Sequence, residues 1–187
     1  PFKFGGYNHT SVKSLAYSMS EHREVALKLL KDGSIEKWLR VGLKNDELAD
    51  QISRIVADTS DSMDTMPHSD DLLLSHILIL LDPNAPITYK DIAYMPDGFG
   101  SAIAIETLRK GDIKNHADSI IKGLPHLWYK NSNLDPNLYL TELDFFDRIE
   151  RYLKKGGPGY GIERCLYETN TGYACQSPII ARENIFV

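Results

Sequence analysis

Histidine and aspartate, residue types that hold catalytic metals in many hydrolases, gather after residue 67. Four of them fall within nine positions: His68, Asp70, Asp71 and His76. A helix rises about 1.5 Å per residue, so His68 and His76 would stand about 12 Å apart, too far to share one metal. No His-Glu-x-x-His pattern occurs. We therefore favour a structural role, with both aspartates at a helix N-terminus, and keep a metal-assisted hydrolase on His68, Asp71 and His76 as the alternative.

A glycine-rich segment covers residues 156–161. Loops of this composition cradle phosphate with backbone N–H groups when they lead from a strand into a helix. This segment instead follows a predicted helix, lacks Gly-Lys-Ser/Thr, and contains Pro158, which has no N–H to donate. We interpret it as a turn between helices. The side chains expected to contact a partner or ligand there are Tyr160, Glu163 and Arg164.

The two cysteines, Cys165 and Cys175, do not form a Cys-x-x-Cys pair. Two thiolates alone do not complete a four-ligand zinc site, so we expect small buried apolar side chains and leave open whether they are bonded. The aspartates Asp58, Asp61 and Asp64 are spaced by three, unlike a calcium-binding EF-hand loop. No kinase, hydrolase, nucleotide-binding or helix-turn-helix fingerprint occurs. The sequence therefore predicts no metal and no cofactor.

The composition is that of an ordinary globular domain. The chain has 187 residues, 42% hydrophobic and 25% charged, with a net charge of −5. No Lys or Arg lies between Arg54 and Lys90, a stretch that contains six aspartates and would repel nucleic acid and anionic lipid. The longest apolar run, within residues 72–81, is interrupted and shorter than the roughly 20 residues of a membrane span. We expect a cytoplasmic protein that binds no membrane. The charge disfavours nucleic-acid binding, which stays open as a third alternative because Arg148, Arg151, Lys154 and Lys155 could form one basic face.

Hydrophobic periodicity places these residues mostly on helices. One helix is predicted over residues 21–31 with Val25, Ala26, Leu29 and Leu30 on one face, and Ser34 is predicted to cap the next. A mainly α-helical domain of eight to ten helices follows, with short β-like segments at residues 2–4 and 87–89. The other predicted helices cover residues 34–43, 45–56, 70–81, 100–109, 113–122, 125–129, 140–154 and a short stretch within 160–167. The helix over residues 140–154 is predicted to carry its apolar residues on one side: Leu140, Leu143, Phe146, Ile149 and Leu153.

A glycine–tryptophan pattern occurs once in each half of the chain. An apolar helical segment, a glycine and then a tryptophan five positions later occur at Gly33–Trp38 and again at Gly123–Trp128. These are the only two tryptophans, and they lie 90 positions apart. One hypothesis is coincidence, since amphipathic helices that end at glycine are common. The other is a duplicated helical unit, with pseudo-repeat halves 1–82 and 83–187 within a single domain 1–187.

These observations favour a non-catalytic role. The chain begins at Pro1 without an initiator methionine, as expected of a domain cut from a larger intracellular polypeptide. Ten tyrosines suit a binding surface, because tyrosine is enriched at interfaces. We expect a helical interaction or regulatory domain whose partner is another protein or the remainder of that polypeptide.

Overall fold

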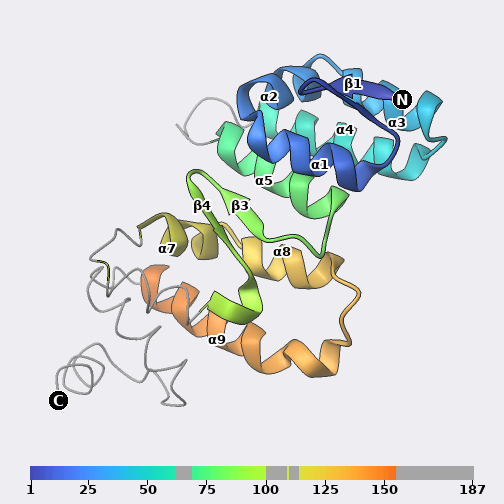
Figure 1. Cartoon of the computed structure of the whole chain (residues 1–187). Coiled ribbons are helices and arrows are strands. Elements are labelled where there is room, and N and C mark those ends of the chain that lie inside the picture. Colours follow the sequence, from blue (N-terminus) through green and yellow to red (C-terminus); the bar gives the residue numbers. More distant parts are fainter. Residues whose placement is uncertain (62–68, 100–108, 110–113, 155–187) are drawn as a thin grey trace. The chain divides into compact units, whose positions relative to one another are not determined.

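The computed structural model describes residues 1–61, 69–99, 109 and 114–154, and the chain divides into two units (Figure 1). Unit 1 is Pro1–Thr88 and unit 2 is Tyr89–Val187. The described part contains eight α-helices and two antiparallel sheets of two strands each. The predicted fold class, mainly α with short β segments, is therefore confirmed. Among the described helices, none has the length and apolar character needed to cross a membrane.

Unit 1 begins with a hairpin and continues with five helices. In the hairpin, Phe2 pairs with His9 and Phe4 with Tyr7. The turn uses Gly5 and Gly6, both at positive φ, where a side chain would be strained. The elements are β1 (Phe2–Phe4), β2 (Tyr7–His9), α1 (Val12–Glu21), α2 (Arg23–Lys31), α3 (Ser34–Gly42), α4 (Asp46–Asp61) and α5 (Ser69–Leu81).

The core of unit 1 surrounds α5, which packs against α1, α2 and α4. Because neighbours cover it on several sides, α5 is apolar almost all round, and Ile77 is fully buried. The hairpin joins the same core through Phe4, and Phe2 contacts the Trp38 ring with centroids 5.4 Å apart. The short strands are therefore held by side-chain packing as well as by their pairing.

Local features of unit 1 differ from the sequence predictions at two places. The buried residues of α2 are Ala26, Leu27 and Leu30, whereas Val25 is 53% exposed. The prediction that Val25 belongs to the apolar face is wrong, because the buried stripe is rotated toward Leu27. Ser34 does not cap α3 either: Gly33 is the N-cap residue, and the Asp32 carboxylate accepts a hydrogen bond from the Ser34 N–H at 2.9 Å.

Unit 2 has a hairpin of the same kind followed by helices. The turn residue Lys90 has positive φ, as the glycines of the first hairpin do. Helix α9 begins earlier than predicted, and Leu140, predicted for its apolar face, is 57% exposed. The first strand of this hairpin, β3 (Ile87–Tyr89), begins in the last two residues of unit 1. The elements that follow it are β4 (Ile92–Tyr94), the 3₁₀ turn η1 (Pro96–Gly98), α7 (Lys114–Ile121), α8 (Leu124–Asn131) and α9 (Pro136–Lys154).

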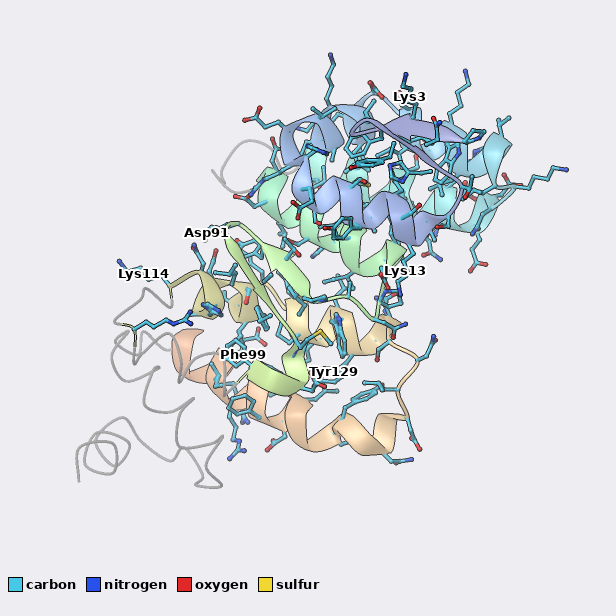
Figure 2. The ribbon with its side chains drawn as sticks, in the orientation of Figure 1. Lys3, Lys13, Asp91, Phe99, Lys114 and Tyr129 are labelled. Carbon is cyan, nitrogen blue, oxygen red and sulfur yellow. The ribbon has the colours of Figure 1, made fainter. Side chains whose placement is uncertain are left out.

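Aromatic side chains fill the interior of unit 2. Figure 2 shows Phe99 and Tyr129 there, each only 1% exposed. The Phe99 ring contacts that of Phe146 on α9 with centroids 5.3 Å apart. Buried polar groups are paired as well: the Tyr94 and Ser119 hydroxyls lie 2.7 Å apart, and burial raises the pKa of Tyr94.

The same joint between helices occurs once in each unit. Gly33 separates α2 from α3 with φ 76°, and Gly123 separates α7 from α8 with φ 72°. The hydrogen bonds around the joints correspond at an offset of 90 residues. Gly33 N–H donates to Leu30 O and Gly123 N–H to Ile120 O, and the next turn is closed by Lys37 N–H to Gly33 O and by Leu127 N–H to Gly123 O. The repeated glycine–tryptophan pattern thus corresponds to the same local backbone geometry in both units. That the pattern arose by duplication stays a prediction.

Candidate functional site

An open groove of about 550 Å³ runs along the outer side of α2 in unit 1. Leu27 contributes its one exposed edge, and charged side chains form the walls. Residues 24, 28 and 31 recur at intervals of three and four, so a single helix face presents them to solvent. The groove is lined by Glu24, Leu27, Lys28, Lys31, Asp32 and Asp70.

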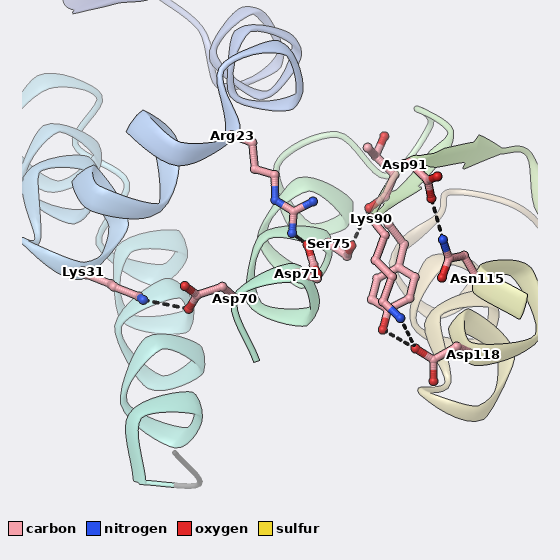
Figure 3. A network of polar contacts seen from close by, with 11 residues as sticks. Arg23, Lys31, Asp70, Asp71, Ser75, Lys90, Asp91, Asn115 and Asp118 are labelled. Carbon is pink, nitrogen blue, oxygen red and sulfur yellow. Dashed lines mark hydrogen bonds and ion pairs between the residues drawn. The ribbon is translucent and has the colours of Figure 1, made fainter. Parts of the chain in front are cut away.

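Two ion pairs join α2, which forms most of the groove, to the first turn of α5. Lys31 Nζ lies 2.7 Å from Asp70 Oδ1, and Arg23 pairs with Asp71 one residue further along α5 (Figure 3). At the C-terminal end of α2, hydrogen bonds from the Ser34 side chain and backbone lower the pKa of Asp32. Two lysines and three carboxylates thus line the groove. Lys31 pairs with Asp70, and Asp32 accepts a hydrogen bond from Ser34 and interacts with the charge of Lys28. The side chains of Glu24 and Lys28 are exposed to solvent.

The corresponding face of α7 in unit 2 carries the opposite charges. At the offset of 90, Glu24 corresponds to Lys114, Lys28 to Asp118 and Asp32 to Lys122. The turn of the second hairpin contacts this face. Lys90 Nζ donates to Asp118 Oδ2 at 2.8 Å (Figure 3), and the Tyr89 hydroxyl donates to the same oxygen at 2.6 Å.

Electrostatics support this contact between turn and helix in unit 2. Burial disfavours the ionised form of Asp118, but the hydrogen bonds from Lys90 and Tyr89 outweigh burial and lower the pKa of Asp118. A second bond joins the same two elements, because Asn115 donates from its amide to Asp91 Oδ1 at 2.5 Å. The α7 face is therefore occupied by the unit's own turn at the position where the α2 face presents Lys28.

Two of the three residues in the metal-assisted hydrolase hypothesis, Asp71 and His76, are described by the structure. Asp71 pairs with Arg23, and His76 is half-buried on α5, where burial lowers the pKa of His76. His68 lies outside the described residues, so the hydrolase hypothesis stays a prediction. Within the described ranges, three potential metal ligands converge at one place, and it is in unit 2: His126, Asp147 and Glu150.

The predicted contact residues Tyr160, Glu163 and Arg164 also lie outside the described residues, as do Cys165 and Cys175. The groove on α2 was not predicted from the sequence. Its signal was present as Glu24 and Lys28, an acid four positions before a base on a helix face, a pattern that is common on solvated helices and does not by itself indicate a site.

Comparison with known proteins gave no match to a family model, to a curated protein or to a solved structure.

Proposed function

We propose that the chain is a non-catalytic helical interaction domain and that the groove along α2 binds a segment of another protein. The observation that supports it is the difference between equivalent faces: Tyr89 and Lys90 contact Asp118 on α7, whereas on α2 the corresponding residue, Lys28, lines an open groove. In unit 2 this helix face, on α7, binds a turn of the same chain. We infer that the corresponding face of α2 in unit 1 can bind a turn of a partner protein.

The chemistry of the groove defines the partner. Leu27 offers a small apolar floor, and Glu24 and Lys28 stand one helical turn apart above it. A complementary segment carries one apolar side chain between a basic and an acidic residue, so that each charge meets its opposite. Charge complementarity of this kind determines specificity and the association rate more than the total affinity.

Apolar residues on the surface of unit 1 also support the proposal. Val25 is 53% and Val41 is 71% exposed, whereas the residues 90 positions later are Asn115 and Asn131. The shared backbone therefore does not require valine at these positions. Single exposed apolar residues are common on protein surfaces, so the valines support the proposal only as part of the comparison between units.

A tandem of two related units would explain why one face is open and the other is covered. After duplication, one copy retains the turn contact through Asp118, and the other is free to change the face for a partner. The proposal that the groove binds a partner does not require that the two units arose by duplication.

Affinity capture from the source cells, followed by binding measurements with the captured protein, tests the function. We expect a charge reversal at the groove, E24K together with K28E, to weaken binding at least about tenfold, which is about 1.4 kcal/mol. The matched control is K130E, because Lys130 is an exposed helical lysine outside the groove. Equal binding by the groove variant and the control would contradict the proposal, and so would failure of the wild type to capture any specific partner.

A further inference from the structure

Three side chains with metal-binding atoms meet where α8 packs against α9. His126 comes from α8, and Asp147 and Glu150 come from one face of α9, three positions apart. The His126 Nε2 and Asp147 Oδ1 atoms lie 2.7 Å apart, and one ligand atom from each of the three residues lies within 4.8 Å of the other two. We propose that these residues form a binding site for a divalent transition-metal ion, with Zn²⁺ as the preferred ion.

The ligand set fits this class of ion. An imidazole nitrogen and two carboxylate oxygens bind Zn²⁺ at about 2.0–2.2 Å, which places neighbouring ligand atoms about 3.3 Å apart in a tetrahedral site. The His126–Asp147 distance needs to open by only a few tenths of an ångström to reach that value. Asp147 is exposed and the other two residues are partly exposed, so water completes the coordination shell. An imidazole favours transition metals over Mg²⁺ or Ca²⁺, which prefer oxygen ligands alone.

The corresponding helix pair of unit 1 gives an independent reason. There, the Arg40 guanidinium bridges α3 and α4, with Nη2 at 2.9 Å from Glu36 and at 2.7 Å from Asp50. It also lies 3.5 Å from Asp46, and its hydrogen bonds to Asp50 and Glu36 raise the pKa of Arg40. One fixed cation thus holds acidic groups of both helices together.

Unit 2 presents ligands instead of an arginine at this helix pair. At the offset of 90, Glu36 corresponds to His126 and Arg40 to Lys130, which is exposed on the last turn of α8. An ion bound by His126, Asp147 and Glu150 would join α8 to α9 as Arg40 joins α3 to α4. Because such an ion binds the folded state, it would also raise the stability of unit 2.

The test uses the full chain without an affinity tag, since tags bind metals. Isothermal titration with ZnCl₂ and CoCl₂ measures affinity and stoichiometry, and thermal unfolding with and without Zn²⁺ measures stabilisation. We expect one ion per chain at this site, an increase in Tm with Zn²⁺, and a loss of affinity of at least about tenfold in E150Q and in H126Q. The matched control is D144N on the same helix, because Asp144 pairs with Arg148 instead, and it should retain the wild-type affinity.

The visible spectrum of the Co²⁺ form separates this site from binding by the cysteines, because thiolate ligands add an intense charge-transfer band in the near ultraviolet. Binding without that band and sensitive to E150Q supports the site. Two results would overturn it: no binding by the wild type at millimolar Zn²⁺, or binding that E150Q and H126Q leave unchanged. Circular dichroism checks that each variant is folded, and E150Q provides the decisive comparison if H126Q is not.

Discussion

The two hairpins both place a two-residue turn between strands of three residues, but they hold these turns by different chemistry. In unit 1 the turn is made of glycines, and a Cβ on Gly5 would lie 2.6 Å from Cδ2 of the His22 ring. The Phe4 ring packs edge-on to the same imidazole with centroids 6.0 Å apart. In unit 2 the turn residue is Lys90, which bonds to Asp118 on α7. One turn therefore depends on shape and the other on charge.

This difference shows that two units can share a backbone geometry although different side-chain contacts stabilise it. The joints at Gly33 and Gly123 have nearly equal φ and matching hydrogen bonds, although the helices around them share few residues. The polar contact in unit 2 covers the α7 face at Asp118, whereas the corresponding residue of α2, Lys28, lines a groove.

The largest effects are expected at the paired tryptophans. Trp38 is 9% and Trp128 is 3% exposed, so W38A and W128A should each lower the free energy of unfolding by about 3–5 kcal/mol. Urea unfolding measured by circular dichroism gives both values. If one substitution costs almost nothing, the two tryptophans do not have equivalent roles in their units.

The next effect tests the shape-dependent turn. We expect G5A to cost about 3 kcal/mol, because positive φ strains alanine and the added methyl group collides with His22. The control is G6A, which has the same φ sign but no atom within 4 Å of the added Cβ, so it should cost only about 1 kcal/mol. Equal costs in urea unfolding would show that the contact with His22 does not constrain the turn.

A smaller effect tests the charge-dependent turn. Because the pKa of Asp118 is lowered in the folded state, its stabilisation is complete above the unfolded value of about 4 and is lost as the pH falls through the folded value. We expect D118N to cost about 1.5 kcal/mol at pH 7, an amount reduced by the partial exposure of the carboxylate, and to cost less in acid. Unfolding at a series of pH values measures the difference, and a difference independent of pH would contradict an ionic contact.

The smallest effects test the shared joint. G33A and G123A place alanine at positive φ with no atom within 4 Å of the added Cβ, so each should cost about 1 kcal/mol through backbone strain alone. The control G98A has open space and no positive φ, and its effect should lie within about 0.5 kcal/mol of zero. Clearly unequal costs for G33A and G123A in urea unfolding would break the equivalence of the joints.

Periodicity in the sequence predicted most helices because a buried stripe needs apolar residues at regular spacing. It placed the apolar helix near residues 70–81 and the helix around 113–122, which the structure has as α5 and α7. It failed at Val25 and Leu140, because the pattern does not determine how far a helix is rotated about its axis against its neighbours. Only packing decides that rotation.

The groove and the cluster around His126 could not be predicted from the sequence for a related reason. Asp70 and His126 become informative only through residues on other helices, and no local pattern brings Lys31 to Asp70 or Asp147 to His126. The glycine–tryptophan pattern could be recognised from the sequence, because both of its residues lie on one continuous segment in each unit.

Labelling of lysine side chains distinguishes an open face on α2 from a covered face on α7. Reductive methylation of the full native chain, followed by mass spectrometry over time, reports the reactivity of each ammonium group. Lys28 is exposed in the groove, whereas the Lys90 side chain is 17% exposed and paired with Asp118. We expect Lys28 to react several times faster than Lys90, and D118N to accelerate the reaction of Lys90 alone. Equal rates for Lys28 and Lys90 in the wild type would contradict this expectation.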